Sequence, residues 1–314
     1  MAGPAGSKVS ASKKVSVAIA GRELTLSNLD KVLYPDAGFT KSQVIDYYAR
    51  IAPVMLPHIS DRAVTLNRFP DGVGGVSFFE KRCPGHRPDW VNTALGPGDR
   101  GGPINYCRLD ETAALVWIAN LAALEVHAPM SRCADIESPT MLVFDLDPGE
   151  PATILECCRI GLALREVLSA VGLAAFPKTS GSKGLQVYVP LNTPHTHEHA
   201  SSFALAVGQL LAKDRPKEVV VTMKKSERTG KIFIDWSQNS RHKTTIAPYS
   251  LRARTKPTAS TPVGWEEVAA GASGAPLRFE ADAVLARVAE MGDLFAPTLT
   301  LEQSLPGGGQ TKIG

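Results

Sequence analysis

The sequence predicts an α+β protein organised around a largely antiparallel sheet. β-rich runs come in neighbouring pairs with Gly and Pro between them, as at 63–69 with 76–81 and again within 176–191, which is typical of hairpins. Helical patterns lie between these groups and do not follow every strand, so a strictly alternating, doubly wound fold is not indicated. With 314 residues, 44% of them hydrophobic, the chain can bury a large core. We expect one compact unit at 17–304 rather than two interleaved smaller domains.

The start of the first helix is encoded locally. Thr40 and Gln43 form a capping box, in which the Thr hydroxyl accepts from a free backbone N–H and the Gln side chain reaches back. Apolar and aromatic residues then follow at helical spacing. A helix should therefore begin at Lys41, and the proline-rich stretch 53–57 is expected to end it.

The later elements follow from the spacing of apolar residues. The apolar run 113–126 predicts a buried helix with His127 at its end. Further expectations are strands at 141–147, 218–223 and 231–236, and helices at 152–171, 200–213 and 281–291. Residues 82–106 contain many Gly and Pro residues and are expected to form an exposed loop. Both ends, 1–16 and 305–314, are expected to be flexible tails.

Charge is unevenly distributed along the chain. The formal net charge is only +3, but the stretch 213–256 carries 12 Lys or Arg residues and 4 Asp or Glu residues. This local excess leaves the remainder net acidic and suits a polyanion such as nucleic acid. A solvated charged face has the same composition, so charge alone leaves both interpretations open.

The cysteines and the N-terminus favour a reduced, cytoplasmic protein. The five cysteines are odd in number and include no pair of Cys-x-x-Cys motifs. Cys83 and His86 have ligand-like spacing but lack a second pair, so a surface loop is favoured over a zinc site. The histidine-rich segment 195–199 precedes a predicted helix and is interpreted as a solvated turn. No apolar run has the length of a membrane span or the pattern of a signal peptide, so no membrane association is expected.

Two aspartates near the end of the 141–147 strand are candidates for chemistry. Asp145 and Asp147 are two residues apart, so on a strand both side chains leave the same face, with Cα atoms roughly 7 Å apart. Burying two carboxylates there is costly unless a cation neutralises them, and hard oxygen ligands suit Mg²⁺ or Mn²⁺. A surface strand end with two solvated acids shows the same pattern, so the pair alone does not decide.

Two further segments strengthen the case. The apolar run 231–236 contains a single acid, Asp235, and a third carboxylate beside the first two would complete a two-metal site. Residues 179–184 place two glycines, hydroxyl groups and Lys183 in a tight turn where backbone N–H groups can approach a phosphate. An ordinary hairpin turn uses many of the same residues. The sequence alone does not establish that the three acids are adjacent.

The order and spacing of these segments resemble the archaeo-eukaryotic primase superfamily. More closely, five motifs look like the polymerase domain of bacterial ligase D and its stand-alone actinobacterial relatives: NLDKVLYP at 28–35, FFEK at 78–81, FDLDPGEP at 144–151, TSGSKGLQVYVP at 179–190 and YSLRAR at 249–254. The resemblance runs from about Ala18 to about Leu305. It implies a primase-like fold, with a largely antiparallel catalytic sheet flanked by helices and an interleaved N-terminal α/β part.

The resemblance also implies roles for individual residues. The catalytic metal ligands, for Mn²⁺ or Mg²⁺, are Asp145, Asp147 and Asp235. The nucleotide-binding residues are His127, Ser180, Lys183, Arg228, Gln238 and Arg252. The implied DNA contacts are Asn28, Lys31 and Lys41 at a downstream 5′-phosphate, and Arg68, Phe78, Phe79 and Lys81 along the template.

Two of the implied DNA contacts carry expectations of their own. Lys41 falls in the first turn of a helix, where a cation opposes the helix dipole, so an anion beside it would stabilise the arrangement. An exposed lysine tolerated at small cost is the alternative. Phe78 and Phe79 are adjacent on a β-run, so we expect one to pack inward and the other to face solvent or DNA.

The implied function is a DNA-directed nucleotidyltransferase that fills gaps or extends ends at 5′-phosphorylated breaks. Its substrates would be NTPs or dNTPs, with a preference for ribonucleotides, and it would act at the bacterial nucleoid in repair or non-homologous end joining. No ligase or nuclease motif is present, so Ku and a DNA ligase are expected to act in trans. The alternatives are a non-catalytic DNA-end-binding module and a metal-dependent nuclease or phosphoesterase using the same carboxylates. Clustered acids argue against a simple binder of polyanions.

Overall fold

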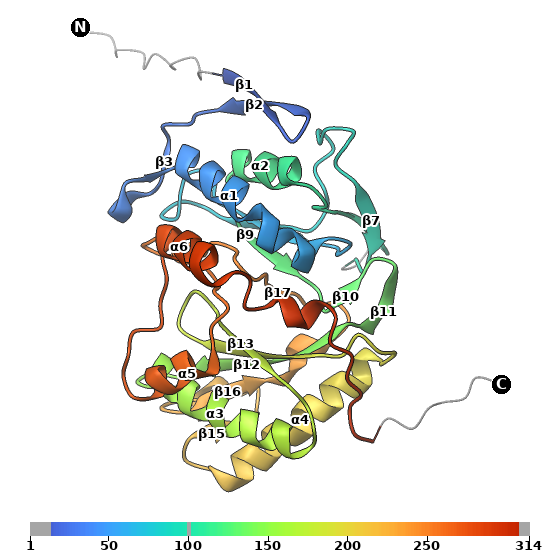
Figure 1. Cartoon of the computed structure of the whole chain (residues 1–314), viewed down its shortest axis with the longest axis vertical. Coiled ribbons are helices and arrows are strands. Elements are labelled where there is room, and N and C mark those ends of the chain that lie inside the picture. The colour runs from blue at the N-terminus through green and yellow to red at the C-terminus, as the bar shows by residue number, and fades with distance from the viewer. Residues whose placement is uncertain (1–13, 99–101, 308–314) are drawn as a thin grey trace, which may run out of the picture.

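The computed structural model describes residues 14–98 and 102–307 and has the α+β organisation expected from the sequence (Figure 1). Most of the buried apolar side chains fall into two large cores. The first draws mainly on residues before 129 and the second mainly on residues after 141. Within the described ranges, no helix combines the length and the apolar character that crossing a bilayer requires.

The first core packs helices against a four-stranded antiparallel sheet of order β17-β9-β5-β6. Its elements, with the small strand pairs beside them, are β1 (Lys14–Ile19), β2 (Arg22–Ser27), β3 (Val32–Tyr34), β4 (Phe39–Thr40), α1 (Lys41–Ile59), β5 (Thr65–Arg68), β6 (Phe78–Glu80), β7 (Thr93–Gly96), β8 (Ile104–Cys107), α2 (Thr112–Asn120), β9 (Ala123–Ala128) and β17 (Thr245–Ile246). Helix α6 (Ala281–Met291) returns from the C-terminal part to lie near α1 (Figure 1).

The second core surrounds a five-stranded sheet of order β13-β14-β12-β16-β15, antiparallel except for the last pair. Its elements and the short strands leading into it are β10 (Ser131–Arg132), β11 (Asp135–Pro139), β12 (Met141–Pro148), α3 (Ile154–Ala170), β13 (Phe176–Thr179), β14 (Leu185–Pro190), α4 (His197–Asp214), β15 (Val219–Val220), β16 (Ile232–Asp235) and α5 (Trp265–Ala272). Single-turn helices occur at Pro35–Ala37, Lys225–Glu227, Trp236–Asn239 (η3) and Ala296–Leu299. Side chains of the central strand β12 point alternately toward the α-helices and toward the site described below.

Several predicted elements are confirmed. Helix α1 begins at Lys41, and both hydrogen bonds of the Thr40 and Gln43 capping box are present. The pairing of β5 with β6, the hairpin of β13 with β14, strand β12 and helices α3, α4 and α6 all occur where the apolar spacing placed them.

The proline-rich stretch 53–57 does not end the first helix, contrary to the prediction. Helix α1 continues through Pro53 and Pro57 to Ile59. Ala52, Met55 and Ile59 are fully buried, so the apolar face of the helix continues across both prolines. Tertiary packing of that face outweighs the local cost of two missing N–H donors.

The predicted helix at 113–126 is also wrong in its second half. Helix α2 stops at Asn120, the chain turns through Ala122 with a φ of 57°, and β9 begins at Ala123. A run that is apolar at every position has no period, so it cannot distinguish a buried helix from a strand buried on both faces. His127 therefore lies on a strand, beside Thr65 of β5 and Ile246 of β17.

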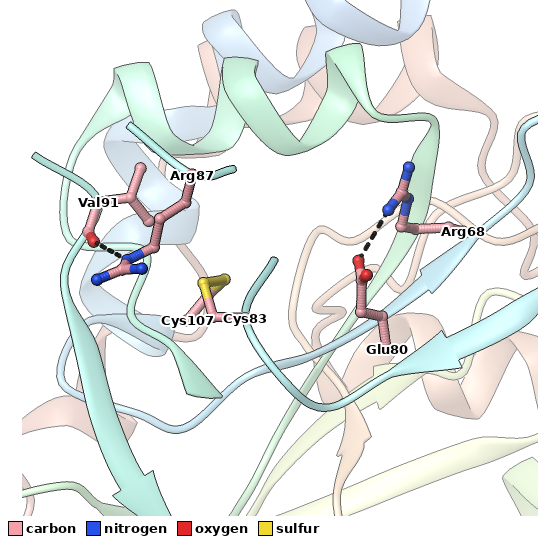
Figure 2. Close-up of a disulfide and its surroundings, with 6 residues drawn as sticks. All are labelled: Arg68, Glu80, Cys83, Arg87, Val91 and Cys107. Carbon is pink, nitrogen blue, oxygen red and sulfur yellow. Dashed lines mark hydrogen bonds and ion pairs between the residues drawn. A yellow bond between two sulfur atoms is a disulfide. The ribbon is translucent and has the colours of Figure 1, made fainter. Parts of the chain in front are cut away.

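The expected exposed loop at 82–106 contains structure, and two cysteines are paired there. Strands β7 and β8 form a hairpin in this segment. The Cys83 N–H donates to the Asn105 carbonyl, and a disulfide joins Cys83 to Cys107 (Figure 2). The prediction of a fully reduced chain is corrected accordingly, since spacing along the sequence carries no information on cysteines that the fold brings together. Cys133, Cys157 and Cys158 are free.

Two boundary predictions and one assignment of a segment also change. Residues 14–16, assigned to the N-terminal tail, belong to β1, and Leu305, assigned to the C-terminal tail, is buried in the second core. Residues 1–13 and 308–314 of the expected tails lie outside the described residues. The segment 195–199 is not a simple solvated turn, because His197 is buried at the start of α4 and bonds through both ring nitrogens to the carbonyls of Asn239 and Ile136.

Candidate active site

The fold brings the three predicted catalytic aspartates together. Asp145 and Asp147 lie two apart on β12, so their side chains leave the same face of the sheet. Strand β16 is the antiparallel neighbour of β12, and its register places Asp235 directly opposite Asp145. Acids that are 90 residues apart in sequence therefore meet on one face of two central strands.

The three carboxylates repel one another in a setting that water screens poorly. Burial, and then the charge of Asp147, raise the pKa of Asp145 to about 7. Burial, and then the charge of Asp235, raise the pKa of Asp147, while Lys183, Arg228 and Arg252 lower it. Such a cluster of hard oxygen donors fits a divalent cation, which would remove the repulsion.

The Asp235 side chain accepts hydrogen bonds from the next residues along the chain, in η3. Its carboxylate accepts from the Ser237 N–H at 3.1 Å, from the Ser237 hydroxyl at 2.6 Å and from Gln238 Nε2 at 2.9 Å. As the side chains stand, no three His, Cys, Asp or Glu residues within 14–98 and 102–307 are arranged to hold a metal ion.

A cavity opens over Asp145 and Asp147. Five of the six predicted nucleotide-binding residues line it. The full lining consists of His127, Asp145, Asp147, Ser180, Ser182, Lys183, Gln186, Gln238, Thr244, Thr245, Ile246, Arg252 and Arg254. Arg228 is not among them: its guanidinium lies 3.6 Å from the ring centre of Phe233 and donates to the Met223 carbonyl.

The turn between β13 and β14 forms one wall of this cavity and requires its glycines. Gly181 has a φ of +68°, and a Cβ at Gly184 would lie 2.5 Å from the Leu146 carbonyl oxygen and 3.5 Å from Asp147 Oδ1. The Ser180 hydroxyl accepts from the Gly184 N–H at 3.0 Å, which fixes the turn against the aspartate strand. Within the part of the chain that the structure describes, the Lys183 ammonium makes no hydrogen bond or ion pair, so it is available to an anion.

A buried carboxylate that the sequence did not single out, Glu125, organises the opposite wall. One oxygen forms an ion pair with Arg252 Nε at 3.2 Å and accepts from the Ala253 N–H at 3.0 Å. The other accepts from His127 Nε2 at 3.0 Å and from Asn67 Nδ2 at 3.1 Å. Although burial alone would raise it, the hydrogen bond from His127 and the charge of Arg252 lower the pKa of Glu125 to about 2. Glu125 therefore stays ionised and holds two cavity residues in fixed positions.

A second buried group, Lys178, lies on the same face of the sheet as the aspartates. The register of the sheet places Lys178, Gln186, Asp145 and Asp235 in one row across β13, β14, β12 and β16. Lys178 Nζ donates to Gln186 Oε1 at 2.5 Å and to Ser260 Oγ at 2.6 Å. Burial lowers the pKa of Lys178 well below its ordinary value.

Comparison with known proteins identifies the family. Residues 40–295 match the model of the LigD primase-polymerase domain. The chain belongs to the LigD primase-polymerase family. It is 46% identical to the multifunctional non-homologous end joining protein LigD of Mycolicibacterium smegmatis over 274 residues, which are 87% of this chain and 35% of that protein. It is 45% identical to LigD of Mycobacterium tuberculosis strain H37Rv over 283 residues, 87% of this chain and 36% of that protein.

A solved structure supports the same assignment. The polymerase domain of Mycobacterium tuberculosis ligase D in complex with DNA superposes with a TM-score of 0.83 at 45% identity, covering 88% of this chain and 98% of that domain. The chain thus spans about a third of the length of the curated LigD proteins and nearly all of the polymerase domain.

Three of the residues with predicted DNA contacts in this LigD-type domain lie together at the start of α1. The Lys31 N–H donates to the Asn28 carbonyl, and the Lys41 N–H donates to the Lys31 carbonyl. Lys31 Nζ pairs with Asp71 at 2.8 Å, whereas Lys41 is buried and its Nζ donates to the Ser27 carbonyl at 2.6 Å. Burial, and then the charge of Lys31, lower the pKa of Lys41 to about 8.

The predicted template residues lie on or beside the edge strand β6. Phe78 and Phe79 are both exposed, at 42% and 60%, so the expectation that one packs inward is wrong. β6 is the edge strand of its sheet. Arg68 lies over the Phe78 ring at 5.2 Å and pairs with Glu80 at 3.0 Å (Figure 2), while the Phe79 ring contacts His127 at 5.3 Å. Lys81 directly follows β6.

Removal of the Glu125 charge should weaken nucleotide binding without moving the aspartates. In Glu125→Gln, an amide nitrogen replaces one carboxylate oxygen, so either His127 and Asn67 lose their acceptor or the Ala253 N–H does, and Arg252 loses its ion pair in both cases. A charge-assisted bond is worth about 1.5–3 kcal/mol. We expect the KM for nucleotide to rise roughly tenfold or more, with a smaller change in kcat. Steady-state extension kinetics measure both constants.

The matched control is Glu267→Gln, which removes a carboxylate paired with Arg287 at 2.7 Å outside the cavity. The nucleotide KM of that variant should be unchanged. Equal changes in the two variants would assign Glu125 a purely structural role.

Proposed function

We propose that this chain is a template-directed polymerase that adds nucleotides, preferably ribonucleotides, at gaps or breaks in DNA whose downstream end carries a 5′-phosphate. The observation that carries the proposal is the alignment of Asp145 with Asp235 on neighbouring strands, together with a cavity that Asp145 and Asp147 line beside the glycine-lysine turn. The relatives support it, since they are named as non-homologous end joining proteins and the solved polymerase domain is in complex with DNA.

Each wall of the cavity has a distinct task in this proposal. Asp145, Asp147 and Asp235 would hold Mn²⁺ or Mg²⁺, which when bound activates the attacking hydroxyl and stabilises the departing pyrophosphate. Lys183 and the Ser180 turn bind the triphosphate from one side, and His127 and Arg252, fixed by Glu125, bind from the other. Gln238 lies between the two walls. Arg228 contributes its charge to Asp147 without lining the cavity.

The proposal also covers the location of the activity in the cell and the proteins that act with it. The named relatives are bacterial, so we place the activity at the nucleoid, with Ku and a DNA ligase acting in trans. A nuclease or phosphoesterase could use the same carboxylates. The glycine-lysine turn and the basic side chains of Lys183 and Arg252 around the cavity favour a triphosphate substrate.

A gapped, 5′-phosphorylated primer-template incubated with Mn²⁺ and NTPs tests the function. The primer should lengthen, and Asp145→Ala should lower the rate by at least about a thousandfold, because metal-based charge stabilisation is worth several kcal/mol. The matched control is Asp214→Ala, an exposed aspartate at the end of α4, which should extend normally. Shortening of the primer indicates a nuclease, and an unchanged primer with retained DNA binding indicates a non-catalytic module.

Lys41 gives the proposed 5′-phosphate site a distinctive pH dependence. A lysine with a pKa of about 8 is charged below that pH and neutral above it. The preference for a 5′-phosphate over a 5′-hydroxyl should therefore be complete near pH 7 and fall as the pH rises through about 8. Binding of the two gapped DNAs between pH 7 and pH 9.5, followed by fluorescence anisotropy, measures this preference.

Lys41→Arg is the control for this titration, because the guanidinium remains charged over the whole range. That variant should keep its preference at pH 9.5, and Lys41→Gln should lack it at every pH. A wild-type preference that is constant from pH 7 to pH 9.5 contradicts the assignment of Lys41 to the phosphate.

A further inference from the structure

A second, shallow hollow adjoins the active-site cavity. Four of its lining residues are basic or can become so: Arg132, Arg241, His242 and Lys243. We call it the basic groove. Thr244 lines both the basic groove and the active-site cavity, so the two are contiguous at that residue.

The basic groove is electrically unbalanced. Among the residues that the structure describes, no Asp or Glu lines the groove, although Asp135 lies opposite Arg132 in the pairing of β10 with β11. Arg241 pairs with Glu137 at 2.6 Å, but both side chains are largely exposed, and such a pair is worth no more than about 1 kcal/mol. In the ranges 14–98 and 102–307, the side chains of Arg132, His242 and Lys243 make no hydrogen bond or ion pair. This local excess of basic side chains fits the phosphates of a nucleic acid strand.

The chain path directs the basic groove toward the reacting atoms. η3 starts directly after Asp235, and the segment 240–244 runs from its end to β17 at the edge of the cavity. A strand lying in the groove would therefore reach the cavity near Thr244 and end close to the aspartates. The strand that must end there in a polymerase is the one whose 3′-hydroxyl is extended.

The other surfaces proposed to bind DNA lie on the opposite side. In the sheet of order β17-β9-β5-β6, the exposed Phe78 and Phe79 are on β6, at the edge farthest from β17. Lys31 pairs with Asp71, in the turn that leads into β6, so the proposed 5′-phosphate site belongs to that side too. The template and the downstream end thus have their own surfaces, and the primer strand is left to the basic groove.

We propose that the basic groove binds the sugar-phosphate backbone of the primer strand upstream of its 3′-hydroxyl, an inference that rests on the proposed polymerase function. Arg132 and Lys243 contact successive phosphates, and Arg241 exchanges Glu137 for a phosphate when the strand is bound. The groove thereby supplies affinity without sequence preference.

The test compares two DNAs that share a labelled template and a 5′-phosphorylated downstream strand and differ only in the presence of the primer. Affinity is measured by fluorescence anisotropy over a range of salt concentrations for the wild type and for the double variant Arg132→Gln, Lys243→Gln. Each phosphate contact contributes about 0.9 to the slope of log affinity against log salt. The double variant should lower that slope by roughly 1.8 and weaken binding at least tenfold on the DNA with the primer, and change neither quantity on the DNA without it.

The matched control is Lys217→Gln, another exposed lysine of the basic stretch, located between α4 and β15 and outside the groove. It should leave both DNAs unaffected. A loss of affinity that is equal with and without the primer overturns the proposal, as does an unchanged salt slope in the double variant.

Binding is measured without catalysis, so the two proposals can fail separately. A wild-type protein that shows the primer-dependent slope but does not extend the primer refutes the polymerase function and leaves the groove as a strand-binding surface. A protein that extends the primer with full affinity in the double variant refutes only the groove.

Discussion

Repulsion among three carboxylates is the constraint around which the rest of the site is arranged. Asp145 and Asp235 face each other in register, and Asp147 lies two residues from Asp145 on the same face. A folded protein keeps such a cluster only if positive charge compensates it. The surrounding cations, Lys183, Arg252 and the buried Lys178, compensate in part, and the raised pKa values of Asp145 and Asp147 show that repulsion and burial outweigh them. The cluster therefore favours the binding of additional cations.

The position of the cavity between the two sheets explains how one chain can organise several ligands. His127, Thr245 and Ile246 come from the sheet of the first core, and Asp145, Asp147 and Gln186 come from the sheet of the second. Glu125 connects the β9 strand to Arg252, so the geometry of one wall depends on a buried network that does not itself line the cavity. Exposed aromatic residues on β6 and uncompensated cations beside β17 extend the site in opposite directions.

Local features of the sequence were sufficient to predict much of this architecture. The capping box at Thr40, the D-x-D pattern on an apolar strand and the glycine-lysine turn each have a local physical cause, and each occurs as expected. The three-way meeting of the aspartates followed only from the family resemblance, because strand adjacency is a long-range property that periodicity does not encode. Arg254, Ser182 and Gln186 lie within the motifs that carried the resemblance, although they were not singled out.

The residues that sequence reasoning missed share a dependence on tertiary structure. Glu125 lies in an apolar run that was predicted to be a helix, and it was not singled out for that reason. On a strand, residues two apart point to the same face, so Glu125 and His127 lie on one face of β9. Cys83 and Cys107 meet because β8 runs beside residue 83, and the prolines of α1 are tolerated because the helix is buried around them. In each case, packing outweighed a local preference.

The most direct test of the central claim is the thermal unfolding of the wild type and of Asp145→Asn, each in EDTA and in Mn²⁺. In EDTA, Asp145→Asn should be at least as stable as the wild type, because it removes a repelling charge from the cluster. Mn²⁺ at a hundred times its dissociation constant should stabilise the wild type by about 2.7 kcal/mol and the variant by clearly less. A wild type that Mn²⁺ does not stabilise, or a variant that is markedly less stable in EDTA, contradicts the view that these carboxylates are assembled to receive a cation.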